Sequence, residues 1–266
     1  MINIQKGAEP QVLHDNKTTW TTDLMALVKK YGSYTDIPKN EKDAAIKYYG
    51  HPDISSALLG PHAKAKCIYC ETYSEVSCFA NIEHFHPKSL YPKETFDWDN
   101  LFVGCTQCNT PKGNFDTVKE PFIHPINDNP EDYLTFDELQ YVPKSSDGVA
   151  YLKAKNVIEK CNLKRRALVN NHAIILLSFL GTRYALSDRI AEYKGRKTER
   201  KKLEDAAILL DSMTVLNSEA SDDAQYAGYM RYLLRKYSEI REAVSIINTH
   251  KEDLGLPDGF KWSFSY

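Results

Sequence analysis

The chain has few cysteines, no long apolar run and a formal net charge of only −2 over 266 residues, and each absence excludes a class of protein. Six cysteines are too few to hold a chain of this length together as a disulfide scaffold. The longest apolar stretch, AIILLSFLG from Ala173, is far shorter than the roughly 20 residues that a membrane span requires. The beginning, MINIQKGAEPQ, lacks the basic and apolar regions of a signal peptide. We therefore expect a cytoplasmic protein without a membrane partner.

The charges are unevenly distributed along the chain. Residues 151–202 contain 14 lysines and arginines against 4 acidic residues, a balance of +10. Residues 67–116 contain 3 basic and 7 acidic residues, a balance of −4. A basic segment favours contact with a polyanion or an acidic partner, although its side chains can equally form the solvated faces of helices. We predict that residues 151–202 bind substrate or a partner.

Periodicity and composition divide the chain into three segments and predict an α+β fold that is mainly helical. Residues 1–60 have the spacing of amphipathic helices, whereas residues 61–120 combine cysteine, histidine and proline without a helical period. Residues 121–266 begin with YLTFDELQYVPKSSDGVAYL, which predicts a hairpin that turns at SSDG. One helix apolar on nearly all sides and one long final helix with an apolar stripe over 226–247 are expected to follow. That stripe is expected to pack on the core of the protein or on a partner helix.

Four of the six cysteines form two CxxC pairs with 34 residues between them: Cys67, Cys70, Cys105 and Cys108. Four thiolates from two tight turns complete a tetrahedral zinc site, and such a closed site is structural rather than catalytic. Chance spacing of free thiols and a redox-active Cys67–Cys70 pair are the alternatives. Cys78 lies between the pairs without a partner, and we expect it to be a free thiol.

The residues between and around the cysteine pairs resemble a known family. The chain reads Glu83–His84 in IEHFHPKS, Asn100 in FDWDNL, and Asn109 with Lys112 in CTQCNTPKG. An acid–histidine pair, a following Asn–Leu and a final Cys-x-x-Cys-Asn-x-x-Lys occur in this order in the HNH endonucleases, which have the ββα-metal fold. The resemblance covers residues 64–118 and implies a small zinc-stapled ββα-metal module within a mainly helical chain.

This resemblance implies a role for each matching residue. Hydrolysis of a phosphodiester requires a base for the attacking water and a cation for the developing charge. His84 would be the base, with Glu83 and Asn109 as ligands of a catalytic Mg²⁺ or Mn²⁺ ion. Asn100 would brace the loop and orient His84, and Lys112, expected at the start of a helix, would contact phosphate.

Two features depart from the family pattern. The acid is Glu83 where many members have aspartate, so the metal geometry differs by one methylene. His86 lies outside the minimal pattern. We expect it to be a surface or turn residue, with a weak metal or phosphate contact as the alternative.

A narrower resemblance is to the PtuB-type HNH proteins of bacterial Septu anti-phage systems, including those associated with retrons. EHF-x-PKS, DWDNL and C-x-x-CN-x-x-KG recur in that group, as does a helical extension after the nuclease core. The resemblance implies a nuclease effector acting on DNA or a structured RNA such as tRNA. It also implies a PtuA-type ATPase as partner, with a retron reverse transcriptase and its nucleic acid in some systems. The alternative is a non-catalytic zinc module that binds nucleic acid or a protein.

Overall fold

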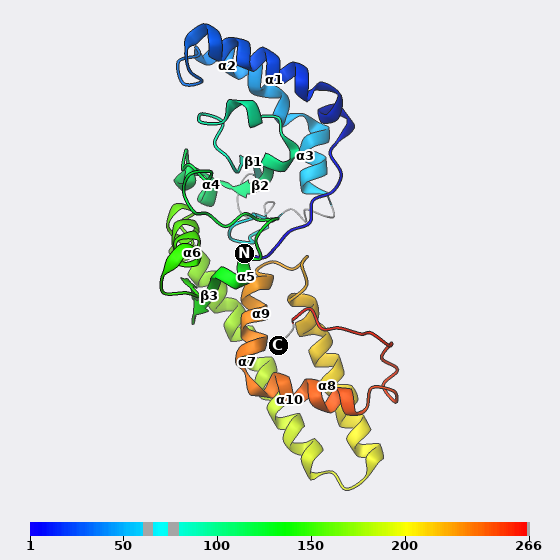
Figure 1. Cartoon of the computed structure of the whole chain (residues 1–266). Helices are drawn as coiled ribbons and strands as arrows, with labels where there is room; N and C mark the ends of the chain where they lie inside the picture. The colour runs from blue at the N-terminus through cyan, green and yellow to red at the C-terminus, as the bar shows by residue number, and fades with distance from the viewer. Residues whose placement is uncertain (61–65, 74–79, 265–266) are drawn as a thin grey trace. The chain divides into compact units, whose positions relative to one another are not determined.

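A computed structural model describes residues 1–60, 66–73 and 80–264 of the chain (Figure 1). Its contacts divide the chain into two compact units, Met1–Arg165 and Arg166–Tyr266. The predicted segments 1–60 and 61–120 both lie within the first unit, together with the first 45 residues of the third segment (121–165). The expectation of an α+β, mainly helical chain is confirmed.

The first unit begins with helices and continues with short strands and turns. Its helices and 3₁₀ turns are α1 (Gln11–Tyr31), α2 (Lys39–Ile46), η1 (Lys47–Gly50), α3 (Pro52–Leu59), η2 (Pro92–Glu94), η3 (Trp98–Asn100), α4 (Thr106–Lys112), α5 (Pro130–Tyr133) and α6 (Gly148–Lys160). Its strands are β1 (Ala80–His84), β2 (Leu101–Cys105), β3 (Leu134–Asp137) and β4 (Gln140–Pro143). Helix α1 ends at Gly32, where φ is +89°, a conformation that glycine adopts without strain.

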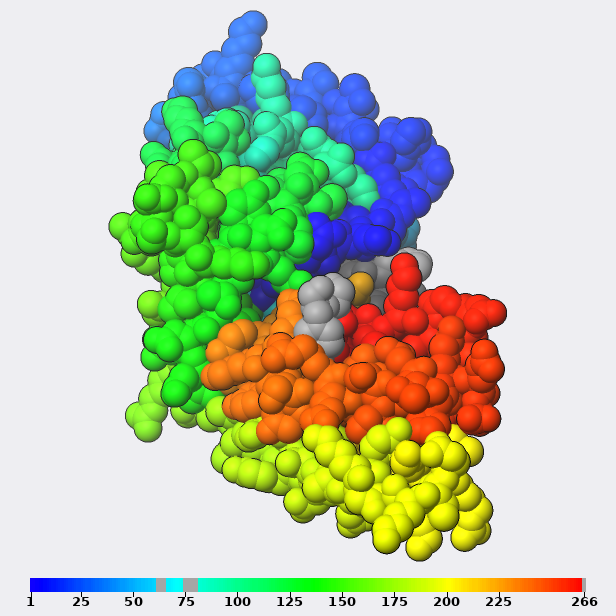
Figure 2. All heavy atoms as spheres, turned by 60° about the horizontal axis from the view of Figure 1, so that its bottom comes forward, coloured from blue at the N-terminus to red at the C-terminus, as the bar shows by residue number. Residues whose placement is uncertain are grey.

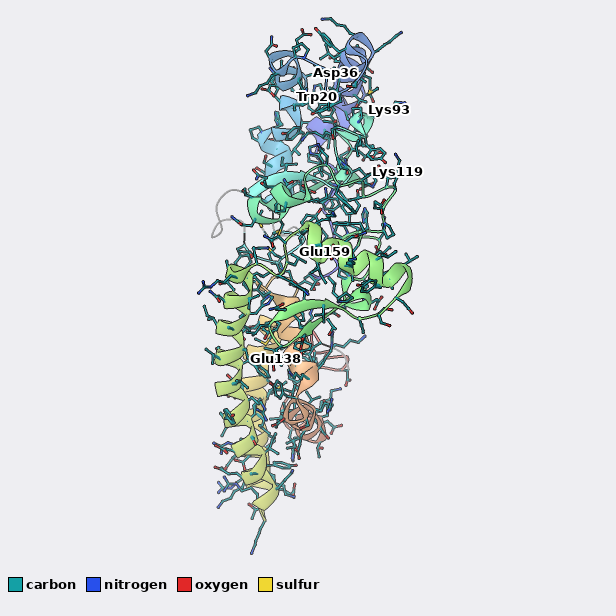
Figure 3. All side chains as sticks on the ribbon, turned by 90° about the vertical axis from the view of Figure 1, so that its left-hand side faces the viewer. Trp20, Asp36, Lys93, Lys119, Glu138 and Glu159 are labelled. Atoms are coloured by element: carbon teal, nitrogen blue, oxygen red, sulfur yellow. The ribbon has the colours of Figure 1, made fainter. Side chains whose placement is uncertain are left out.

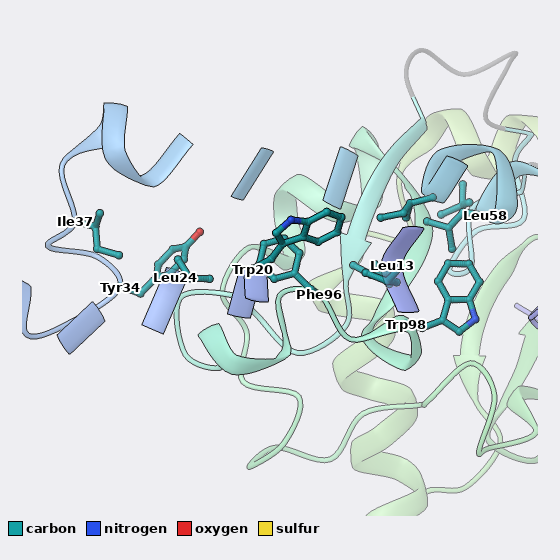
Figure 4. Packing of buried hydrophobic residues seen from close by; sticks show 11 residues of the cluster. Leu13, Trp20, Leu24, Tyr34, Ile37, Leu58, Phe96 and Trp98 are labelled. Carbon is teal, nitrogen blue, oxygen red and sulfur yellow. The ribbon is translucent and has the colours of Figure 1, made fainter. Parts of the chain in front are cut away.

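The core of the first unit joins the N-terminal helices to the segment around β2. Trp20 of α1 stacks on Tyr48 with ring centres 4.8 Å apart, and it meets Phe96 with centres 5.5 Å apart (Figure 4). Trp98 and Leu101 belong to the same buried cluster. Because these residues are far apart in sequence, burying their apolar surface fixes the N-terminal helices against the strands.

Strands β1 and β2 form an antiparallel pair, and α4 follows β2 directly (Figure 1). The register places Glu83 opposite Phe102 and His84 opposite Leu101. All five residues of β2 are buried, as expected for a strand covered on both faces. Short helix α4 starts at the cysteine that ends this strand, so the strand pair and helix hold their side chains close together.

The predicted hairpin exists, but its turn was placed wrongly. Strands β3 and β4 pair through Asp137 and Gln140, so the turn consists of Glu138 and Leu139 rather than SSDG. Glu138 adopts a positive φ of +49° in this turn. The SSDG sequence instead precedes α6, whose N-cap is Asp147. The apolar residues after SSDG were interpreted as a strand, although Asp–Gly also favours the start of a helix.

The second unit consists of four helices and the chain that follows them: α7 (Arg166–Gly195), α8 (Glu199–Glu219), α9 (Ala227–Lys236) and α10 (Ser238–Thr249). Helix α10 packs against α7 and α8, and in the space-filling view the orange and red α9–α10 segment lies against their yellow ends (Figure 2). Within the described residues, no helix combines the length and the apolar character that a bilayer crossing requires.

Two predictions about this unit need correction. The single final helix is two helices, because Tyr237 has an extended backbone (φ −100°, ψ 131°) between α9 and α10. Its apolar stripe does pack on the unit's own core, where Met230 and Ile240 are buried. Helix α7 is not buried on nearly all sides, because its apolar residues Ile174 and Leu177 are 66% and 70% exposed.

A buried carboxylate connects α7 to α8. Asp205 of α8 is buried and accepts hydrogen bonds from Arg189 (2.9 Å) and from Nε of Arg196 (2.7 Å). The guanidinium of Arg196 lowers the pKa of Asp205 against the opposing effect of burial, and Arg189 adds to the lowering. The ionised form of Asp205 is therefore favoured more strongly in the folded unit than in the unfolded chain.

We expect Asp205→Asn to lower the free energy of unfolding by about 2 kcal/mol at neutral pH, because it removes a buried charge from two guanidinium groups. The pKa of Asp205 is lowered on folding from 3.8, so its contribution is present above that value and is lost as the pH falls through the folded value. Urea unfolding followed by circular dichroism at about pH 7 and about pH 3 measures this, and the difference from the unmodified chain should shrink in acid. Asp211→Asn, an exposed position on the same helix, is the matched control. A pH-independent difference would contradict the assignment.

Candidate metal centre and active site

The four cysteines of the two CxxC pairs meet in one buried cluster. The sulfur atoms of Cys67, Cys70, Cys105 and Cys108 all lie within 4.8 Å of one another. Mutual hydrogen bonds lower the pKa of Cys70 and Cys105, whereas burial raises that of Cys67. Soft thiolate ligands at these separations suit a metal ion such as zinc, and the cation favours the thiolate form of each ligand. The predicted structural metal site therefore has its ligand set in place; Cys78 lies outside the described residues.

The backbone around Cys67 folds as a tight turn that presents two sulfurs in one direction. The amide of Glu71 donates to the carbonyl of Cys67 (2.9 Å), and the amide of Cys67 donates to the carbonyl of Thr72 (3.0 Å). The amide of Ile68 donates to the carbonyl of Val103 (3.0 Å), which ties the turn to β2. The second pair starts α4, since Cys105 is its N-cap. The cluster thus fixes β2, α4 and the turn relative to one another.

Arg165 completes the surroundings of the cluster. Its guanidinium donates to the sulfur of Cys108 (3.4 Å) and to the carbonyl of Asn162 (3.2 Å). A four-thiolate zinc site has a net charge of −2, so a partly buried guanidinium beside it offsets unfavourable charge. In the sequence, Arg165 stands out only as one residue of the basic stretch 151–202, so its contact with Cys108 was not predicted.

A cleft of about 460 Å³ opens beside β1 and α4. Its lining includes Glu83, His84 and Asn109 of the predicted site. Tyr34 and Thr35, from the turn between α1 and α2, line the same cleft. The N-terminal segment therefore forms one wall of the candidate site, which the sequence alone did not indicate.

His84 is held in one orientation by two contacts. Its Nε2 donates to the carbonyl of Thr95 (2.9 Å), and because a carbonyl only accepts, Nε2 carries the hydrogen. Nδ1 is then the basic nitrogen, and it accepts from the ammonium of Lys88 (3.3 Å). Burial and the charge of Lys88 lower the pKa of His84 well below the usual histidine value. The imidazole is therefore neutral near pH 7 and able to accept a proton.

Glu83 is buried in an ion pair. Its Oε1 lies 2.6 Å from the ammonium of Lys112 and accepts a hydrogen bond from the hydroxyl of Tyr69 (2.9 Å). Burial raises the pKa of Glu83, and Lys112 and Tyr69 act in the opposite direction. Lys112 also donates to the carbonyl of His84 (3.1 Å) and is the last residue of α4. The expected position of Lys112 at the start of the helix is therefore wrong, and its ammonium is engaged inside the protein.

Asn109 and Glu83 approach each other across Gly104. A Cβ atom at Gly104 would lie 3.0 Å from Cβ of Glu83 and 3.7 Å from Cβ of Asn109. Any larger residue at position 104 would push against these two side chains. Glu83 and Asn109 both line the cleft, and carboxylate and amide oxygens are hard ligands of the kind that suits Mg²⁺ or Mn²⁺, which retains several waters.

Asn100 and His86 lie behind the cleft. Oδ1 of Asn100 accepts from the amide of His86 (2.6 Å), and its Nδ2 donates to the carbonyls of His86 and Glu94 (both 3.1 Å). Because Glu94 precedes Thr95, this bracing fixes the loop that holds the carbonyl partner of His84. The ring of His86 pairs with Glu94 (2.5 Å) and is not among the residues that line the cleft.

Sequence reasoning assigned no role to Lys88 or Tyr49. The ring of Tyr49 meets that of His84 edge-on with centres 4.8 Å apart, and the ammonium of Lys88 lies 4.6 Å from the centre of the Tyr49 ring. The PKS sequence after the histidines was the available signal for Lys88. Tyr49, which ends a helical segment, carried none.

The basic stretch 151–202 is largely paired with acidic side chains. Arg196 contacts Asp205, and Lys194 and Lys202 pair with Glu242 and Glu199. Lys153 pairs with Asp128 at 2.7 Å in the first unit. Glu199 is already counted within the stretch, but Asp205, Glu242 and Asp128 lie outside it and offset part of the excess of +10, so the net basic surface is smaller than the sequence indicates.

Comparison with known proteins gives two curated relatives, both named Septu protein PtuB. The protein of Bacillus thuringiensis is 36% identical over 118 residues, which are 44% of this chain and 43% of that protein. The protein of Bacillus mycoides (strain KBAB4) is 27% identical over 206 residues, 65% of this chain and 66% of that protein. None of the protein-family models matches the chain. The chain spans less than two thirds of either relative and is similar in sequence to Septu PtuB proteins.

Proposed function

We propose that the protein is a metal-dependent endonuclease of the HNH type, which hydrolyses phosphodiester bonds of DNA or of a structured RNA. The observation that carries the proposal is the setting of His84. Its Nδ1 carries the lone pair, its Nε2 is fixed by Thr95, and Glu83 and Asn109 share its cleft. The order β1, β2, α4 agrees with the ββα-metal module that the sequence motifs imply.

Each site residue that the sequence motifs indicate has a task in this reaction. His84 accepts a proton from a water at Nδ1 while the water oxygen forms a bond to phosphorus. The ester P–O bond breaks, and the departing oxygen keeps the electron pair and takes a proton from solvent. Glu83 and Asn109 would hold Mg²⁺ or Mn²⁺, which when bound neutralises charge on the phosphate. Asn100 keeps the loop of Thr95 in place, and the four cysteines hold the strand–helix scaffold.

The similarity to two proteins named Septu protein PtuB supports a role in anti-phage defence. We extend the proposal to a complex in which a PtuA-type ATPase controls the nuclease. A wider assembly with a retron reverse transcriptase is part of the same proposal for systems that contain one.

One observation favours the second candidate, a non-catalytic zinc module that binds nucleic acid or a protein. Lys112 already neutralises Glu83 inside the protein, as a purely structural ion pair would. The experiment that separates the two uses the zinc-loaded chain, alone and with its co-expressed ATPase, on supercoiled plasmid and on total tRNA. Cleavage that requires added Mg²⁺ or Mn²⁺ supports the nuclease. Binding without cleavage under any of these conditions supports the module.

A further inference from the structure

The candidate cleft contains a cation to which the catalytic scheme assigns no task. Lys88 lines the cleft with Glu83, His84 and Asn109. Its ammonium lies 3.3 Å from Nδ1 of His84 and against the face of Tyr49. Within the described residues, no carboxylate oxygen lies close enough to the ammonium of Lys88 to form an ion pair, for which the limit is 4.0 Å. The charge of Glu83 acts on Lys88 without an ion pair between them, and the groups that Lys88 contacts directly are neutral. Such a half-buried ammonium is suited to an anionic ligand.

The neighbouring residue adds a second unused group. Ser89 also lines the cleft, and its hydroxyl is buried without a hydrogen-bond partner among the described residues. A buried hydroxyl without a partner is unfavourable, and ligand sites are where such groups are retained. Lys88 and Ser89 thus contribute an ammonium-bearing and a hydroxyl-bearing residue to the lining of the same cleft.

Two other cations of the described residues, Lys112 beside Glu83 and Arg165 beside the cysteine cluster, are already engaged. The ammonium of Lys112 bonds to Glu83 and to the carbonyl of His84, and its side chain is 1% exposed. Arg165 donates to the sulfur of Cys108. Among the described residues that line the cleft, Lys88 is the one lysine or arginine, and a ligand can reach it without breaking an ion pair.

We propose that Lys88 and Ser89 bind a non-bridging oxygen of the scissile phosphodiester, an inference that rests on the nuclease function proposed above. Without substrate, the ammonium of Lys88 donates a hydrogen bond to Nδ1 of His84. A phosphate oxygen is a stronger acceptor than a neutral imidazole, so the bound diester draws the ammonium away and opens Nδ1 to the attacking water. Lys88 exchanges no proton in this scheme. It holds the substrate and releases the base only when substrate is present.

Binding can be measured without chemistry in the zinc-loaded His84→Ala chain, with bis(p-nitrophenyl) phosphate as the probe and NMR titration as the readout. Adding Lys88→Met should weaken binding about tenfold or more, because a charge-assisted hydrogen bond is lost. Lys88→Arg should retain binding within about threefold, and Ser89→Ala should weaken it about threefold. Lys93→Met is the matched control, since Lys93 is exposed, lies outside the cleft and points outward (Figure 3).

Hydrolysis of the same diester by chains with His84 intact distinguishes this inference from the nuclease proposal itself. Loss of binding and a reduced kcat/KM in Lys88→Met, with both restored by Lys88→Arg, support the role of Lys88. Unchanged binding and unchanged kcat/KM in Lys88→Met overturn it and leave the nuclease proposal intact. If the unmodified chain binds the diester through Lys88 but hydrolyses none in added Mg²⁺ or Mn²⁺, either alone or with its co-expressed ATPase, the anion site stands and the nuclease proposal fails. Zinc content and circular dichroism show that each variant is folded.

Discussion

Replacing His84 by alanine is expected to lower the rate of phosphodiester cleavage by about 10²- to 10⁴-fold, the usual contribution of a general base. Nδ1 of His84 is the unprotonated nitrogen in the cleft, and burial lowers its pKa so that it is neutral near pH 7. Without it the attacking water has no positioned base. Initial rates of plasmid nicking and tRNA cleavage in added Mg²⁺ or Mn²⁺ measure the effect, with zinc content determined on the same samples.

His86→Ala is the matched control for this prediction. His86 lies two residues farther along, pairs with Glu94 and does not line the cleft. We expect its replacement to change the rate by less than about threefold, which is within 1 kcal/mol. Equal losses in the two variants, or full activity of His84→Ala with zinc retained, would sink the assignment of His84.

Replacing Cys70 by serine is expected to remove the metal and destabilise the first unit. The four sulfurs lie within 4.8 Å of one another, so each contributes to one tetrahedral site. Structural zinc contributes on the order of 10 kcal/mol to small domains, and loss of one ligand forfeits at least about 4 kcal/mol of it. The melting temperature should fall by about 10 °C or more. Metal analysis and differential scanning calorimetry measure the two effects, and chelator treatment of the unmodified chain should reproduce them.

Cys161→Ala separates the loss of a ligand from the loss of a buried cysteine. Cys161 is fully buried and does not belong to the cluster. Its replacement creates a small cavity, with an expected cost of about 1 kcal/mol and no loss of zinc. If Cys70→Ser retains a full complement of metal, the four-cysteine site is wrong.

The parts of the site that depend on short sequence spacing were predictable. CxxC fixes two sulfurs within one turn, so the ligand set of Cys67, Cys70, Cys105 and Cys108 could be inferred before their separation was known. Glu83–His84, Asn100 and Asn109 could likewise be proposed as site residues, because each lies in a short motif. Glu83, His84 and Asn109 meet around one cleft because β1 pairs antiparallel with β2 and α4 starts directly after β2.

The parts that depend on distant packing were not predictable. Tyr34 lines the cleft and Tyr49 meets the ring of His84, and both pack on the core that Trp20 and Phe96 share. No local pattern connects these positions. Lys112 was placed at the wrong end of its helix. Its burial was not predictable either, because it depends on an ion pair with Glu83 of β1. The break at Tyr237 was missed because two helices can share one apolar stripe with an unbroken spacing.

The distance along the chain between the two cysteine pairs determines when the cleft can exist during synthesis. Glu83 and His84 lie between the pairs, whereas Asn109 follows the last metal ligand directly. A growing chain that has emerged only as far as His84 lacks the ligands that close the loop, and it also lacks β2 and α4. The cysteine cluster can form only once Cys105 and Cys108 have left the ribosome. A nascent chain that ends before them therefore lacks both the full set of cluster ligands and the residues of β2 and α4 from which the cleft is built.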